Sequence, residues 1–138
     1  MVSWNNLDTL SSYKELADVK PACLTEVMSG DNGAERVKNY SIPMAAGLSY
    51  NYASKQVNEN VLDALEKLAD EAQLADKFKA LYNGEVVNTG EKRLVLHHMT
   101  RGQLGDAVEA DGVDKRTFYK TQQERIAEFA NKVHNGEL

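Results

Sequence analysis

Apolar residues recur every three or four positions through most of this chain, and this spacing restricts its fold more than any other feature. Residues on one face of a helix repeat at that interval, whereas a half-buried strand repeats every two residues. The spacing predicts helices near residues 3–17, 58–82, 89–101 and 114–135. Asn58 is placed to cap the second helix, and Asn88 with Glu91 has the spacing of a capping box before the third.

Further local signals refine these helices. Ser3 is placed to cap the first helix, and Pro21 suits the first turn of a short helix that ends near Met28, before Gly30. The last helix carries several apolar residues on one face, which we expect to point inward. These residues are Phe118, Ile126, Phe129, Ala130 and Val133.

A segment near residues 37–54 differs from the rest. It contains Tyr, Ile and Val in two short runs separated by Gly47, a composition typical of a small β-hairpin. Strands do not alternate with helices anywhere, so a parallel sheet is not expected. The sequence therefore predicts a mainly α fold with a small β-hairpin (α+β), organised as a single unit over residues 1–138.

Composition narrows the classes of partner. The chain has 16 basic and 21 acidic residues and a net charge of −5, which disfavours binding to nucleic acids and to anionic membranes. Cys23 is the only cysteine, so an internal disulfide is impossible and a reducing compartment is expected. Polar residues such as Asn5 and Asp8 occupy the place of a signal-peptide core, and no apolar run is long enough to span a bilayer. We expect a cytoplasmic protein.

Motifs for catalysis or cofactor binding are missing from the sequence. There is no glycine-rich phosphate loop. His97 and His98 are adjacent and would point about 100° apart on a helix, and Cys23 has no second cysteine with which to ligate a metal. The carboxylates of Glu66, Asp70 and Glu71 are expected on a solvated helix face. We therefore predict no catalytic, substrate-binding, cofactor-binding or metal-ligating residue, and no cofactor.

Arg93, His97 and Arg101 form one unusual cluster of cationic residues. They are spaced four residues apart, which would place them on one face of a helix over about 12 Å. Three such groups in line need an anionic or carbonyl partner. That partner is either a ligand phosphate or carboxylate, or internal carboxylates and carbonyls of the protein, and the sequence favours the internal partners.

Residues 82–101 carry a longer motif. They read Tyr-Asn-Gly-Glu-Val-Val-Asn-Thr-Gly-Glu-Lys-Arg-Leu-Val-Leu-His-His-Met-Thr-Arg and resemble a motif of the glucose-6-phosphate isomerase family. The matching positions are Asn83, Gly84, Glu85, Asn88, Glu91, Arg93, Val95, Leu96, His97 and Arg101. Gly90 stands where the family usually has Thr, and a weaker similarity covers roughly residues 31–136.

The resemblance implies a cytosolic, metal-independent and usually homodimeric enzyme that interconverts glucose 6-phosphate and fructose 6-phosphate. In that family a glutamate base moves a proton through an enediol, and two sugar-isomerase α/β domains hold the phosphate. The resemblance places all of those residues beyond Leu138. It thus implies an N-terminal segment that lacks the sugar-isomerase domains, is inactive alone, and has the rest of the enzyme chain and the second subunit as partners.

Two other interpretations remain open at this point. The chain can be a stand-alone helical module, derived from the enzyme, that binds a partner through a formerly buried face. Alternatively, it can be a regulatory binder of small phosphates that uses Arg93, His97 and Arg101.

Overall fold

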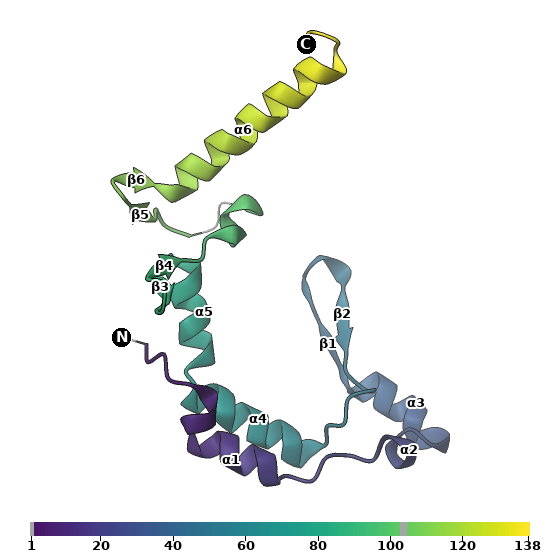
Figure 1. The fold of residues 1–138 in the computed structure, drawn as a ribbon. Coiled ribbons are helices and arrows are strands. Elements are labelled where there is room, and N and C mark those ends of the chain that lie inside the picture. Colours follow the sequence, from purple (N-terminus) through teal and green to yellow (C-terminus); the bar gives the residue numbers. More distant parts are fainter. Residues whose placement is uncertain (1, 103–104) are drawn as a thin grey trace. The chain divides into compact units, whose positions relative to one another are not determined.

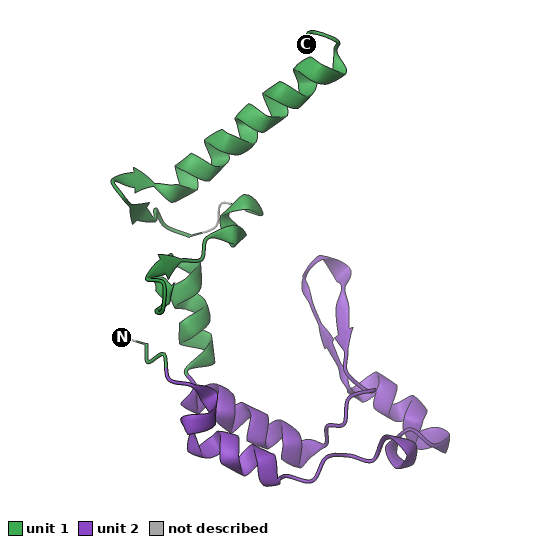
Figure 2. Cartoon of the chain, viewed as in Figure 1, with its two compact units in different colours: residues 1–4, 73–138 green, residues 5–72 purple. Residues whose placement is uncertain are grey.

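A computed structural model describes residues 2–102 and 105–138. The single unit expected from the sequence is divided into two compact units, Asn5–Ala72 and Met1–Trp4 together with Gln73–Leu138 (Figure 2). Each unit has its own internal contacts, described below. In the described part of the chain, no helix combines the length and apolar character that crossing a membrane requires.

The unit Asn5–Ala72 is mostly helical and contains one hairpin (Figure 1). In chain order its elements are the 3₁₀ turn η1 (Leu7–Thr9), α1 (Ser11–Asp18), α2 (Leu24–Val27), α3 (Gly30–Asn39), β1 (Ser41–Pro43), the 3₁₀ turn η2 (Ala45–Gly47), β2 (Ser49–Asn51) and α4 (Glu59–Glu71).

The helix predicted near residues 3–17 is shorter than expected. Leu10 has the extended conformation of an N-cap, so α1 begins only at Ser11, and Ser3 is not its cap. A separate 3₁₀ turn precedes it, closed by the Thr9 hydroxyl, which donates to the Asn6 carbonyl. Gly30 was expected to end the short helix before it, but it is also the first residue of α3. Helix α3 was not predicted from the sequence.

The predicted hairpin near residues 37–54 is confirmed, although its strands are short. β1 and β2 are antiparallel, with Ile42 opposite Tyr50 at the centre of the register. Residues 37–39 belong to the end of α3 instead of the hairpin. The hairpin is held to α3 by the Asn51 amide, which donates to the Val37 carbonyl over 2.7 Å.

Arg36 of α3 is buried and fixes the segment that follows the hairpin. Its Nε donates to the Ala53 carbonyl over 2.8 Å, and its Nη2 donates to the carbonyls of Lys55 and Val57 over 3.1 and 2.8 Å. The guanidinium also lies 4.0 Å from the ring centre of Tyr40. One side chain thereby satisfies three backbone acceptors in a segment without regular structure.

The helix predicted over residues 58–82 is interrupted. Asn58 caps α4 as expected, because its side chain accepts the Val61 amide over 3.0 Å. The helix stops at Glu71, and Gln73 adopts a left-handed conformation with φ 54° and ψ 40°, which a right-handed helix cannot include. Helix α5 (Leu74–Tyr82) then begins in the second unit.

Between α5 and a long helix, the described part of the second unit contains two short antiparallel strand pairs and a 3₁₀ turn. After α5 come β3 (Val86–Asn88), β4 (Arg93–Leu94), the 3₁₀ turn η3 (His97–Thr100), β5 (Glu109–Ala110), β6 (Val113–Asp114) and α6 (Lys115–His134). β3 pairs with β4, and β5 pairs with β6, both antiparallel.

The prediction of a helix over residues 89–101 is wrong, because this range contains β4 and the 3₁₀ turn η3 instead. The pairing between Asn88 and Glu91 does form, since the Asn88 side chain accepts the Glu91 amide over 3.1 Å and donates to its carboxylate over 3.2 Å. It closes the turn between β3 and β4 instead of starting a helix. Lys92 has φ 54°, which a right-handed helix cannot include, and β-branched Val86, Val87 and Val95 favour extended backbone.

The helix predicted over residues 114–135 is confirmed as α6, and the Asp114 side chain caps it by accepting the amides of Arg116 and Thr117. The expected burial of its apolar face is wrong for four residues. Phe118, Ile126, Phe129 and Val133 are 45, 68, 62 and 50% exposed, and Ala130 is half-buried. The core of this unit is a small cluster of Leu96, Met99 and Val108, against which Leu94 and Tyr119 pack.

Candidate functional site

Arg93, His97 and Arg101 do not share a helix face. Arg93 lies in β4, His97 begins η3, and Arg101 follows η3; all three are exposed. Arg93 pairs with Glu91 over 3.7 Å, with both side chains mostly in solvent. The interpretation of the three residues as a linear cationic site is therefore wrong, because the helix on which it depended is absent.

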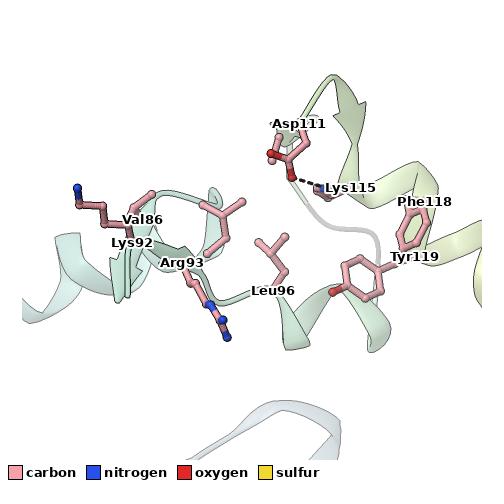
Figure 3. A pocket seen from close by; sticks show the side chains of 10 residues that line it. Val86, Lys92, Arg93, Leu96, Asp111, Lys115, Phe118 and Tyr119 are labelled. Atoms are coloured by element: carbon pink, nitrogen blue, oxygen red, sulfur yellow. Dashed lines mark hydrogen bonds and ion pairs between the residues drawn. The ribbon is translucent and has the colours of Figure 1, made fainter. Parts of the chain in front are cut away.

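A groove of about 490 Å³ lies in the second unit. Its lining consists of Val86, Lys92, Arg93, Leu94, Leu96, Ala110, Asp111, Lys115, Phe118 and Tyr119. Figure 3 shows apolar side chains across its floor, while Lys92 and Arg93 extend outward in different directions. Across the groove, Lys115 Nζ is paired with the Asp111 carboxylate at 3.3 Å.

This groove is poorly suited to acid–base chemistry or phosphate binding. The carboxylate in its lining is engaged with Lys115, and the lining includes no histidine. A phosphate site needs donors that converge on one point, whereas the two outward cations diverge. The apolar floor fits a buried hydrocarbon side chain better than a charged ligand.

Buried Arg116 and half-buried His98 form a polar cluster that the sequence did not predict. Arg116 Nη2 donates to the Tyr82 carbonyl over 3.1 Å, and Arg116 Nε donates to the Asp106 carbonyl. His98 Nε2 shares the Tyr82 carbonyl over 3.1 Å, so this nitrogen carries the proton, and the His98 and Tyr82 rings stack with centres 4.7 Å apart.

The acceptors in this cluster explain its role. They are backbone carbonyls up to 34 residues away in the sequence from Arg116, so periodicity gives no sign of them. Within the described residues, Arg116 Nη1 and His98 Nδ1 have no hydrogen-bond partner. The cluster joins the end of α5, η3 and the start of α6, which is a structural task.

The family-like motif over residues 82–101 likewise shapes the backbone. Gly84 ends α5 with φ 74°, and a Cβ there would lie 2.3 Å from a methyl group of Val108. Asn88 and Glu91 close the β3–β4 turn, and Leu96 belongs to the small core. These motif residues therefore hold loops in place.

Glu71 was expected on a solvated face but performs a specific structural task in the first unit. Its carboxylate accepts the amides and the hydroxyls of Ser11 and Ser12 at the start of α1, including the Ser12 amide at 2.8 Å. The hydroxyl and then the amide of Ser12 are the main causes that lower the pKa of Glu71 to about 2. The carboxylate thus acts as the N-terminal cap of a helix 60 residues away.

Metal ligands are not gathered in the described residues, which contain no cluster of three or more His, Cys, Asp or Glu side chains able to hold an ion. Cys23 is exposed, with its sulfur 3.1 Å from the Thr25 hydroxyl. His98 is occupied by the Tyr82 carbonyl.

Comparisons with known proteins give a consistent picture. The family model for phosphoglucose isomerase matches residues 51–138. A glucose-6-phosphate isomerase of Treponema denticola is 42% identical over 142 residues, covering 99% of this chain and 27% of that protein. The Borreliella afzelii enzyme is 41% identical over 140 residues, covering 100% and 26%, and the Pseudomonas aeruginosa enzyme is 37% identical over 102 residues, covering 74% and 18%. The chain spans about a quarter of the length of the first two relatives.

Proposed function

The chain belongs to the phosphoglucose isomerase family, and on that premise we propose that it forms the N-terminal quarter of a glucose-6-phosphate isomerase. The intact enzyme would interconvert glucose 6-phosphate and fructose 6-phosphate. The observation that carries this proposal is the identity of about 40% with curated isomerases over the whole chain. The motif over residues 82–101 lies within that match and agrees with it.

The role proposed for these residues is that of a scaffold without catalytic groups. Proton transfer in an isomerase needs a base placed beside bound sugar phosphate. Three candidate bases already have other partners: Glu71 caps a helix, Asp111 is paired with Lys115, and His98 is bound to a carbonyl. These engagements support the proposal that the segment is inactive alone.

A coupled assay tests this assignment. The 138-residue chain should show no turnover of fructose 6-phosphate, whereas the intact protein from the same gene should be active. Turnover by the purified chain would overturn the scaffold role, and an inactive, properly folded intact protein would overturn the assignment as an isomerase.

The setting of the intact enzyme is part of the proposal. The acidic net charge of the chain and its single cysteine support a reducing, cytoplasmic location. The resemblance to the family supports a homodimer that needs no metal or other cofactor. Sedimentation of the intact protein should show a dimer. The coupled assay should show full activity in the presence of a chelator.

A stand-alone helical interaction module is the second candidate, and the exposed apolar residues of α6 favour it. Reading the gene past the codon for Leu138 separates the two candidates. An in-frame continuation of α/β sequence supports the enzyme, and an immediate stop codon supports the module.

A further inference from the structure

The end of helix α5 is held by two donors that share one acceptor. The Tyr82 carbonyl is among the last carbonyls of α5, which have no partner inside the helix. It accepts His98 Nε2 from η3 and Arg116 Nη2 from the start of α6, each over 3.1 Å. We call these three groups the His98 latch, because they join three elements of the second unit at one oxygen atom.

The His98 latch is closed to solvent and contains no counter-charge. Arg116 is only 6% exposed, and a Cβ added to Gly105 would lie 2.8 Å from its Nη2. In the described part of the chain, Arg116 Nη1 and His98 Nδ1 are buried without a hydrogen-bond partner. The printed acceptors of both side chains are backbone carbonyls, so the positive charge of Arg116 is not neutralised by a carboxylate in the latch.

Other charged or titratable groups lie on the elements that meet at the latch, but they have other roles. Asp106 contributes its backbone carbonyl to Arg116, and the Asp114 carboxylate caps α6. Lys115 is paired with Asp111. The remaining groups of this kind are the Tyr82 phenol on α5, exposed His97 and Arg101 at the two ends of η3, and Tyr119 of α6, which packs on the small core.

The geometry of the latch fits a neutral imidazole. Nε2 of His98 carries the single proton because it donates to the Tyr82 carbonyl, which leaves Nδ1 as an acceptor. A second proton would have to bind Nδ1, where it would find neither an acceptor nor solvent. It would also bring a second positive charge to within about 6 Å of the Arg116 guanidinium, since both side chains bond to the same oxygen.

The dipole of α5 acts in the opposite direction but is weaker. The C-terminus of a helix carries about half a negative charge, which favours a nearby cation. Arg116 already supplies a full positive charge at that end of α5. The sum of the two is positive, so the latch has room for one cation and one neutral donor.

We propose that the His98 latch is an acid-sensitive device, which holds α5, η3 and α6 together only while His98 is neutral. When the latch opens, the imidazole reaches water and takes up a proton as any exposed histidine does, with an ordinary pKa of about 6.5. Acid therefore shifts the equilibrium from the closed to the open form. The stability that the closed latch contributes is complete above about pH 6.5 and decreases as the pH falls below that value. This device is independent of the isomerase activity proposed above.

Hydrogen exchange of the intact protein from the gene that encodes this chain tests the latch. The amides of Met99 and Arg101 report on η3, because each donates over 3.0 Å to the carbonyl three residues earlier. A closed form that takes up no proton should lose about 10-fold in population relative to the open form between pH 7.5 and pH 5.5. The protection factors of both amides, corrected for the intrinsic pH dependence of exchange, should fall by that amount. Amides of α4 should show no such change, since all three histidines lie outside residues 5–72.

His98→Gln and His97→Gln form a matched pair of variants. Glutamine at position 98 can still donate to the Tyr82 carbonyl but does not titrate, so the protection of η3 should be equal at the two pH values. His97 is exposed, and its replacement should leave the ~10-fold loss unchanged. His98→Phe serves if His98→Gln does not fold, because it keeps a ring against Tyr82 and also cannot titrate.

Three results would overturn the proposal. They are equal protection of η3 at both pH values in the unaltered protein, a loss that persists when His98 is replaced, and free exchange of Met99 and Arg101 already at pH 7.5, which would mean that the latch is open. Isomerase activity is measured in parallel. Any of these results in an active enzyme leaves the proposed function standing, whereas an acid-sensitive latch in an inactive protein supports the latch and overturns the proposed function.

Discussion

Replacing Arg36 by lysine should destabilise the first unit more than any exposed substitution of the same type. The guanidinium makes three hydrogen bonds, to the carbonyls of Ala53, Lys55 and Val57, and it stacks on Tyr40. Hydrogen bonds from charged donors contribute about 1.5 kcal/mol each at the low end of their range, and an exposed cation–π contact adds ~0.5 kcal/mol. The whole arrangement is therefore worth about 5 kcal/mol.

Lysine keeps the charge but not the planar fork, so one of the three carbonyls can still be reached. Two lost hydrogen bonds correspond to about 3 kcal/mol. For a chain with an m-value of ~1.5 kcal/mol/M in urea, the unfolding midpoint should fall by about 2 M. Such a loss is a large part of the total stability of an ordinary domain, which is about 5–15 kcal/mol.

Urea unfolding of the 138-residue chain, followed by circular dichroism, measures this shift. Arg125→Lys is the matched control, because Arg125 is exposed on α6, and its replacement should change the stability by less than ~0.5 kcal/mol. Equal midpoints for Arg36→Lys and Arg125→Lys would refute the reasoning, since they would mean that the buried fork contributes nothing beyond its charge.

Three further substitutions test other contacts. Glu71→Gln should flatten the acid dependence of stability. The folded-state pKa of Glu71, about 2, lies below the ordinary 4.5, so its carboxylate stabilises the fold above pH 4.5 and this contribution is lost as the pH falls from about 4.5 to about 2. Acid titration followed by circular dichroism measures the difference. Gly84→Ala should cost about 2–4 kcal/mol in urea unfolding because of its φ of 74° and the 2.3 Å approach to Val108, whereas Gly112→Ala, with φ 71° and open space, should cost only ~1 kcal/mol. Asn58→Ala should lower the thermal midpoint through the loss of about 1 kcal/mol of helix capping, and Asn58→Asp should retain most of it.

Local signals in the sequence were sufficient where neighbouring residues decide the structure. Asn58 caps α4 and Asp114 begins α6, because a cap needs only the amides of the next two or three residues. The hairpin at Ile42 and Tyr50 was predicted for the same reason. The pairing of Asn88 with Glu91 was also predicted, but the same pairing fits a turn as well as a helix start, and with Lys92 at φ 54° it closes a turn.

Contacts between residues far apart in the sequence could not be predicted from apolar periodicity or local capping signals. Arg36 and Arg116 bind backbone carbonyls, which every residue possesses, so nothing in the sequence marks their acceptors. The apolar residues of α6 were correctly assigned to one face, but periodicity shows only which side is apolar and not what covers it. The loss of the predicted helix over residues 89–101 in turn removed the candidate site that depended on its geometry.

The cap that Glu71 provides for α1 has a consequence for the order of events on the ribosome. Helix α1 has eight residues, too few to be stable in isolation, and the carboxylate that caps it lies 60 residues later in the chain. At about 5–20 residues per second, the ribosome needs roughly 3–12 s to synthesise that interval. Helix α1 therefore leaves the exit tunnel before the carboxylate that caps it, and it gains this cap only after Glu71 has emerged.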